Sequence, residues 1–262
     1  GDTEKARKLL NDLEDRHYNI CRELLGKDSS HFKNVYNKIQ DYFSDIKELL
    51  KGVSLLAELS DRSLAKIITH GELLSSAIID AVLNHTNIKT KLIDARDFIY
   101  TDNNYLVGEP LTDKIKSETP KAINNHFEDY KVILTQGFIS NTVEKITTTL
   151  GRGGSDYSAA LIGMAIDAEE IEIWTDVDGM LTADPRKVNN TKIIPVISFE
   201  EAAELAYFGA KVLHPLTIQP AVEKDIPVRI LNSKYPEKEG TLILSDSKII
   251  KGGIKSISCK EN

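Results

Sequence analysis

The sequence predicts an α/β protein with a mostly parallel sheet. From residue 71 onward, short apolar runs typical of buried strands alternate with segments of helical periodicity. That alternation is the pattern of a parallel sheet covered by helices. Two long helical patterns precede it without an intervening strand. A chain of 262 residues can bury a sizeable core, as one large domain or two small ones.

The composition is that of a soluble globular protein, with 41% hydrophobic and 28% charged residues. A net charge of −7 argues against a nucleic-acid partner. The two cysteines, Cys21 and Cys259, lie far apart and fit a reducing compartment. We find no apolar signal segment and no apolar run of membrane-spanning length, so we expect a cytoplasmic protein without a membrane partner.

Residues 1–70 are expected to be helical. Apolar residues recur at helical spacing over residues 2–25, and Gly26 ends that pattern. Ser29 or Ser30 can cap a second helix, whose apolar stripe runs to Leu50. Residues 54–60 and 61–70 read as further short helices.

An α/β core is expected over residues 71–245. Its first helix covers residues 71–82 and holds Glu72 in its first turn, where a carboxylate compensates the helix dipole. The expected strands cover residues 89–95, 131–139, 171–177, 227–231 and 241–244. The expected helices cover residues 111–130, interrupted by Pro120, then 198–208, capped by Ser198, and 214–222. Residues 140–146 are polar and are expected to form a mobile loop, and residues 246–262 a linker.

A glycine-rich stretch over residues 147–156 leads into the next helical pattern and organises this core. Gly151, Gly153 and Gly154 surround Arg152, and a helix N-terminus approached by glycines exposes backbone N–H groups to an anion. The guanidinium of Arg152 adds a planar fork suited to a carboxylate or phosphate. The alternative is an ordinary turn with Ser155 or Asp156 as the N-cap. The stretch matches neither the P-loop nor the dinucleotide-binding fingerprint.

Four motifs follow one another in the second half of the chain. They are Thr-Gln-Gly-Phe at 135–138, Leu-Gly-Arg-Gly-Gly-Ser-Asp-Tyr at 150–157, Trp-Thr-Asp-Val-Asp-Gly at 174–179 with Asp-Pro-Arg at 184–186, and Phe-Gly-Ala-Lys-Val-Leu-His-Pro at 208–215. Together, in this order, they closely resemble the aspartokinases of the amino-acid kinase family. The third and fourth motifs also resemble the kinase part of bifunctional aspartokinase–homoserine dehydrogenases.

The resemblance implies a three-layer αβα sandwich of the carbamate kinase-like type. It also implies transfer of the γ-phosphoryl group of ATP to the β-carboxylate of L-aspartate, with Mg²⁺ carried on the nucleotide and no dedicated protein metal site. This reaction is the first step of lysine, threonine and methionine biosynthesis. The family's ligands would be L-aspartate and ATP, and the complete protein would be a homo-oligomer.

Site residues are carried over where the motifs match. For the amino acid, the resemblance implies Arg152 on a carboxylate, Glu72 on the amino group and Phe138 as a wall. Further donors to it would be Gly153, Gly154 and Ser155. The nucleotide would meet Thr175, Asp176, Leu181, Arg186 and Lys211. Asp156 and Lys211 would be the catalytic pair, with Asp156 holding the catalytic lysines in place. His214 is expected to be structural.

Two departures from the family pattern stand out. Aspartokinases begin with a strand and a Lys-Phe-Gly-Gly-Thr-Ser loop, which this sequence does not contain, so we expect an N-terminal segment with its strands to be missing from it. The alternative is an inactive version. Leu181 also stands where many relatives have a tyrosine beside the nucleotide base. The end of the chain resembles the lead-in to regulatory ACT domains.

Two other functions remain open at this point. One is a different kinase of the family, acting on glutamate, acetylglutamate or uridylate. The other is a regulatory module that binds ligands without turnover.

Overall fold

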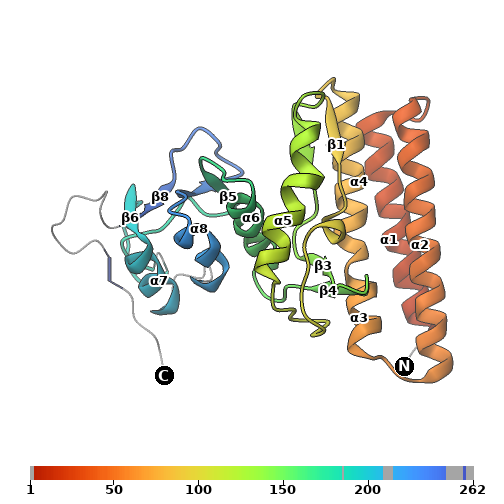
Figure 1. Cartoon of the computed structure of the whole chain (residues 1–262). Helices are drawn as coiled ribbons and strands as arrows, with labels where there is room; N and C mark the ends of the chain where they lie inside the picture. The colour runs from red at the N-terminus through yellow and green to blue at the C-terminus, as the bar shows by residue number, and fades with distance from the viewer. Residues whose placement is uncertain (1–2, 185, 209–214, 246–255, 258–262) are drawn as a thin grey trace. The chain divides into compact units, whose positions relative to one another are not determined.

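The computed structural model describes residues 3–184, 186–208, 215–245 and 256–257. The chain divides into two compact units, residues 1–152 and residues 153–262, which are described separately (Figure 1). The expected boundary at residue 70 separates segments by their secondary structure, whereas the division between compact units falls between Arg152 and Gly153. Lys211 and His214 lie outside the described residues, as does most of the expected linker.

The first unit opens with a helical layer. Helices α1 (Thr3–Leu25), α2 (Ser30–Leu56) and α4 (His70–His85) lie side by side (Figure 1), and the shorter α3 (Asp61–Ile68) connects α2 to α4. Their apolar stripes form one core, which consists of Leu10, Cys21, Leu25, Val35, Ile39, Phe43, Ile46, Leu74, Ala77, Ile78 and Ala81. Because the helices bury their faces against one another, the helical periodicity alone identified them.

The ends of α2 show how the local sequence sets its length. The Ser29 hydroxyl caps its N-terminus by accepting a hydrogen bond of 3.0 Å from the Phe32 amide. The helix runs to Leu56, and Ala57 ends it in the left-handed conformation, with φ of 53°. The prediction of a separate helix over residues 54–60 is therefore wrong.

The remainder of the first unit is α/β. Strands β1 (Thr90–Leu92) and β2 (Val132–Leu134) pair in parallel, and β3 (Ile139–Asn141) and β4 (Thr147–Thr149) form an antiparallel hairpin. The segment between β1 and β2 contains η1 (Ala95–Asp97), α5 (Thr112–Ile123) with Pro120 inside it, and η2 (Asn124–His126). The first residues of the expected mobile loop at 140–146 therefore belong to a strand, which corrects that expectation.

A row of buried hydroxyl groups explains why the β3–β4 hairpin looks polar in the sequence. Thr148 Oγ1 lies 2.7 Å from Thr101 Oγ1 and 2.8 Å from Ser140 Oγ. All three side chains are buried. Buried polar groups are tolerated when they are hydrogen-bonded, so this polar segment can be part of the interior.

The second unit contains a four-stranded sheet in the order β5-β7-β8-β6. Its strands are β5 (Ile171–Thr175), β6 (Val196–Ser198), β7 (Val228–Asn232) and β8 (Thr241–Leu244). The β5–β7 and β6–β8 pairs are parallel, whereas β7 and β8 are antiparallel. The predicted α/β class is confirmed, and the described strands form three separate hydrogen-bonded sheets, of which this one is mixed.

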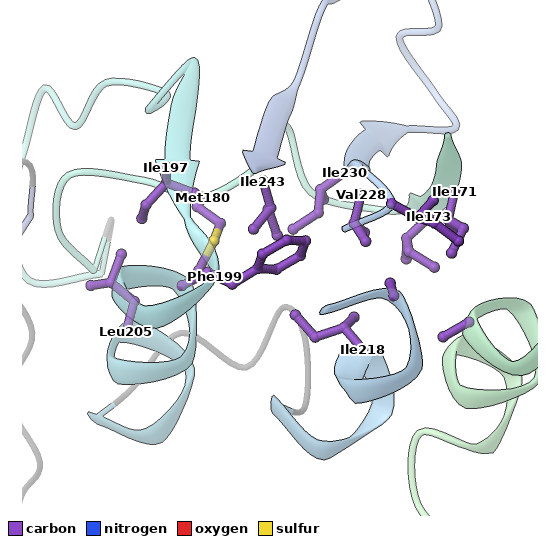
Figure 2. Close-up of a cluster of buried hydrophobic side chains, with 14 of the residues drawn as sticks. Ile171, Ile173, Met180, Ile197, Phe199, Leu205, Ile218, Val228, Ile230 and Ile243 are labelled. Carbon is purple, nitrogen blue, oxygen red and sulfur yellow. The ribbon is translucent and has the colours of Figure 1, made fainter. Parts of the chain in front are cut away.

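Helices cover one face of this sheet. They are α6 (Gly154–Ala165), α7 (Phe199–Phe208), η3 (Pro215–Ile218) and α8 (Gln219–Glu223). Figure 2 shows Ile173, Val228 and Ile230 of the sheet pointing toward Phe199 and Ile218 of the helical layer. This core fixes the position of the strand ends that carry the candidate nucleotide residues.

The start of α7 is held by a reciprocal cap. The Ser198 hydroxyl accepts a hydrogen bond of 3.1 Å from the Glu201 amide, and the Glu201 carboxylate accepts one of 2.9 Å from the Ser198 amide. This is the capping box expected of a serine three residues before a glutamate. None of the helices in the described parts of the chain is both long and apolar enough to span a membrane.

Candidate functional site

The glycine-rich stretch ends at the N-terminus of α6. Gly151 and Gly153 both have φ of 71°, a left-handed conformation that favours glycine. Gly153 is the N-cap, so the alternative of a Ser155 or Asp156 cap is wrong. The first amides of a helix have no intrahelical acceptor, and here they belong to Gly154, Ser155 and Asp156. This end of α6 therefore has the donors that an anion requires.

Glu72 lies in the first turn of α4 and is half-buried. Within the described residues, no hydrogen bond or ion pair reaches its carboxylate. Burial raises the pKa of Glu72 because the charged form loses water. A buried charge is costly unless it has a partner, so the site favours a cationic ligand.

A framework of hydrogen bonds links the helix of Glu72 to the β2–β3 turn. Ser76 lies one turn after Glu72 on the same side of α4, because residues four apart are neighbours on a helix. The Gln136 side chain donates to Ser76 Oγ at 2.8 Å and accepts from the Ala95 amide at 2.9 Å. Gln136 is buried and stands two residues before Phe138. The framework therefore ties the helix that carries Glu72 to the β2–β3 turn that carries Phe138.

The same framework continues to Arg152. The Phe138 carbonyl accepts a hydrogen bond of 2.9 Å from the Leu150 amide, two residues before Arg152. Phe138 has φ of 69°, a left-handed conformation that is costly for an aromatic residue and that recurs at ligand-binding sites. Arg152 is exposed and, within the described residues, its guanidinium has no hydrogen bond or ion pair. The first unit thus brings the predicted residues Glu72, Phe138 and Arg152 into one connected framework.

Asp156 lies in the first turn of α6 in the second unit. It is half-buried, and burial raises the pKa of its carboxyl group. Among the described residues it has no hydrogen-bond or ion-pair partner. Its environment is therefore suited to receive a cation.

The predicted nucleotide residues Thr175 and Asp176 lie at the carboxyl end of β5. The Thr175 carbonyl accepts hydrogen bonds from the Ser233 amide at 2.8 Å and from the Ser233 hydroxyl at 3.0 Å. Thr175 also pairs in register with Asn232 at the end of β7. Asp176 is exposed, with its carboxylate open to solvent. Ligands of α/β sheets bind at such carboxyl ends.

A polar cluster around Asp178, which sequence reasoning missed, anchors the loop that follows β5. Asp178 accepts a hydrogen bond of 2.6 Å from the Asn232 side chain and pairs with the Lys238 ammonium at 2.8 Å. The bond from Lys238, with that from Asn232, lowers the pKa of Asp178. Only the Asp-Gly turn at 178–179 signalled this cluster, because its partners lie 54 and 60 residues away.

Leu181 and Arg186 follow in the same loop. Leu181 forms an isolated antiparallel β-bridge with Ile193, and its carbonyl accepts a hydrogen bond of 3.1 Å from the Ser256 hydroxyl. The Arg186 guanidinium is 78% exposed and pairs with Asp184 at 2.8 Å. The hydrogen bonds from Arg186 lower the pKa of Asp184 to about 2. Arg186 therefore remains charged and accessible.

The structure thus groups the predicted residues within each unit. Glu72, Phe138 and Arg152 share the framework of the first unit, whereas the α6 start, the β5 end and the 176–186 loop belong to the second. Among the described residues, no cluster of three or more histidine, cysteine, aspartate or glutamate side chains could hold a metal ion. A cavity of about 980 Å³ between the start of α1 and the end of α2 contains none of the predicted site residues.

The chain is similar to known proteins over most of its length. The model of the Amino acid kinase family matches residues 6–232. Aspartokinase 1 of Arabidopsis thaliana chloroplasts is 39% identical over 227 residues, covering 86% of this chain and 40% of its own length. The bifunctional aspartokinase/homoserine dehydrogenase of Buchnera aphidicola is 39% identical over 228 residues, covering 86% and 28%.

A solved structure shows the same fold. Escherichia coli aspartokinase III in complex with aspartate and ADP matches with a TM-score of 0.84 and 35% identity, over 94% of this chain and 53% of its own. The chain therefore spans about half or less of the length of the relatives that it matches.

Proposed function

The chain belongs to the amino acid kinase family, and we propose that it is the catalytic part of an aspartate kinase. The proposed reaction transfers the γ-phosphoryl group of ATP to the β-carboxylate of L-aspartate and gives 4-phospho-L-aspartate and ADP. The similarity to aspartokinases over most of the chain supports this substrate class.

One observation carries the proposal. The first unit holds a carboxylate and a guanidinium, those of Glu72 and Arg152, that both lack partners among the described residues and are linked by one framework. A free amino acid presents an ammonium and a carboxylate, which complement these two groups. The planar fork of Arg152 suits a carboxylate in bidentate geometry. We assign Phe138 as the apolar wall of the amino-acid pocket.

The proposed reaction requires the protein to position its reactants and to supply positive charge. The β-carboxylate of aspartate is ionised near neutral pH, so it can attack without a general base. Phosphoryl transfer then depends on alignment and on neutralising the charge of the moving phosphoryl group. Arg186, which is exposed and charged, and Lys211 are the residues that we assign to the phosphates of ATP. The amides at the start of α6 add further donors.

The nucleotide is assigned to the second unit. Thr175, Asp176 and Leu181 would contact its base and ribose, and Asp156 would hold the cationic side chains in place. Mg²⁺ neutralises phosphate charge when it is bound with ATP. It usually retains water and phosphate ligands and needs few protein groups.

The assay is ADP release coupled to a spectroscopic readout. In the complete protein, with the expected N-terminal segment present, we expect release to require both L-aspartate and Mg·ATP. Arg152→Ala and Asp156→Ala should each lower kcat/KM by about 100-fold or more, because each removes a charge at the reacting groups. Arg62→Ala, which removes an exposed arginine of α3, is the matched control and should retain full activity. Activity of Arg152→Ala equal to that of the control would contradict the site assignment.

A substrate panel separates aspartate kinase from the other kinases of the family. Glu72 needs a free ammonium as its partner, so an N-acetylated amino acid should neither bind nor react. Phosphorylation of acetylglutamate or uridylate in preference to L-aspartate would contradict the proposal. Binding without turnover in the complete protein would identify a regulatory module. We also expect the complete protein to be cytoplasmic and a homo-oligomer. Its mass in solution would test the oligomeric state.

A further inference from the structure

The direction of the Arg152 side chain depends on the backbone that precedes it. No described residue binds the guanidinium, so the backbone of residues 149–151 sets the position and direction from which the Arg152 side chain extends. On one side, the Leu150 amide is bonded to the Phe138 carbonyl at 2.9 Å. On the other side, these residues contact a loop formed by residues 102–109, which the predicted function does not use.

The 102–109 loop makes three hydrogen bonds with Thr149. The Thr149 amide donates to the Tyr105 carbonyl at 2.8 Å, and the Thr149 carbonyl accepts from the Gly108 amide at 2.8 Å. The Thr149 hydroxyl donates to the Leu106 carbonyl at 2.6 Å. Thr149 is buried, so these bonds are shielded from water and hold the loop firmly against β4.

Side chains within the loop fix its conformation. The Asp102 carboxylate accepts hydrogen bonds from the Asn104 amide at 3.1 Å and from the Glu109 amide at 3.0 Å. The Asp102 amide also donates to the Glu109 carbonyl at 3.0 Å, which closes the loop at its base. An aspartate that bonds to later amides in this way is a common device for fixing a turn.

Val107 carries the contact from the loop to Gly151. A Cβ added to Gly151 would lie 3.1 Å from one methyl of Val107 and 3.2 Å from the other. Val107 is nevertheless 60% exposed, so its position is not explained by burial in the core. Its side chain therefore lies over the residue that turns the chain into Arg152.

We propose that the 102–109 loop is a positioning element for the amino-acid substrate. It holds Thr149 and, through Val107, the left-handed turn at Gly151, and it thereby aims the Arg152 guanidinium at the substrate carboxylate. This inference rests on the proposed function. It assigns Asp102 and Val107 as positioning residues, which act through Arg152 and do not touch the reacting atoms.

The test measures the KM for L-aspartate and the KM for Mg·ATP separately. Asp102→Ala removes the two hydrogen bonds that the carboxylate accepts inside the loop. It should raise the KM for L-aspartate about tenfold, because small misplacements of a substrate-orienting group have large effects. The KM for Mg·ATP should change less than about twofold. Asp102→Asn keeps an acceptor oxygen at the same place and should behave like the parent protein.

Val107→Ala should show the same selective rise in the KM for L-aspartate. Its matched control is Val143→Ala, a valine of similar exposure (51%) in the turn at the opposite end of the β3–β4 hairpin. Val143→Ala should leave both KM values unchanged. Equal unfolding midpoints of all variants would separate positioning from a loss of folded protein.

A double-mutant cycle tests whether the loop acts through Arg152. In an Arg152→Lys background, Asp102→Ala should have a smaller effect, because a flexible ammonium depends less on direction than a planar fork. An undiminished effect in that background would overturn the inference. So would unchanged KM values for L-aspartate in Asp102→Ala and Val107→Ala while the parent remains active. A parent that does not bind L-aspartate would refute the proposed function and the inference with it.

Discussion

Replacing Glu72 with glutamine distinguishes between two roles for its carboxylate, ligand binding and structural support. Gln keeps the size of the side chain and removes its charge. If Glu72 pairs with the substrate ammonium, L-aspartate should bind more weakly to Glu72→Gln. If the charge is unpaired in the empty protein, the same variant should be more stable than the parent. A structural glutamate would lose a partner and show the opposite sign of stability change.

The magnitudes follow from the burial of Glu72. Removing one member of a buried charge pair costs about 2–5 kcal/mol, and the half-buried position of Glu72 places it at the lower end, about 2 kcal/mol. Since about 1.4 kcal/mol corresponds to tenfold in affinity, Kd should rise about 30-fold. Relief of the buried charge should stabilise the empty protein by about 0.5 kcal/mol once solvent screening is allowed for. That gain corresponds to roughly 1–2 °C in Tm.

The pH dependence gives an independent check with a fixed sign. Burial raises the pKa of Glu72, so its ionised form destabilises the folded protein at pH values above that pKa. As the pH falls through the raised pKa, Glu72 takes up a proton and the destabilisation disappears. The Tm advantage of Glu72→Gln should therefore shrink toward acidic pH, and aspartate binding by the parent should weaken over the same range.

Titration calorimetry with L-aspartate and thermal unfolding without ligand measure the two quantities. Asp80→Asn is the matched control, because burial also raises the pKa of Asp80 on α4 but Asn84 is its hydrogen-bond partner at 3.1 Å. That variant should not change the affinity for L-aspartate. A lower Tm for Glu72→Gln together with an unchanged Kd would refute the reasoning.

Two further predictions concern the second unit. The bonds from Lys238 and Asn232 lower the pKa of Asp178, so they stabilise the fold above the unfolded-state pKa, and this stability is lost as the pH falls through the lowered one. The urea midpoint of the parent should therefore fall further on acidification than that of Asp178→Asn, and equal acid sensitivity would contradict this role. Ser198→Ala removes the acceptor that caps α7 and should cost about 0.5–2 kcal/mol in urea unfolding. It should leave the KM for L-aspartate unchanged, and a stability equal to that of the parent would show that the capping box contributes nothing.

The sequence predicted those elements whose cores follow a simple period. Helix α1 was predicted with its C-terminal end and α2 with its start, because apolar residues recur along one face and Ser29 is a strong cap. The β3–β4 hairpin was missed because Ser140 and Thr148 are buried through partners that no local pattern reveals. The antiparallel direction of β7 against β8 also depends on tertiary pairing and has no local signature.

The candidate site likewise contains residues that the sequence predicted and residues that it missed. The family resemblance identified Glu72, Phe138 and Arg152, and their functional roles stay predictions. The supporting residues could not be found from the sequence, because the Gln136 bond to Ser76 joins residues 60 positions apart. Groups that hold a site in place are defined by such distant partners, whereas groups that meet ligands recur in recognisable motifs.

The row of hydroxyl groups beneath the hairpin can be followed from the one contact whose acceptor is a carbonyl. Thr101 donates its single hydroxyl proton to the Asp102 carbonyl at 3.0 Å. With that proton engaged, the consistent order has Thr148 donating to Thr101 and Ser140 donating to Thr148, since each hydroxyl carries one proton. In that order the dipoles of the row all point toward the Asp102 carbonyl, so the buried hydroxyls of the hairpin connect to the base of the 102–109 loop.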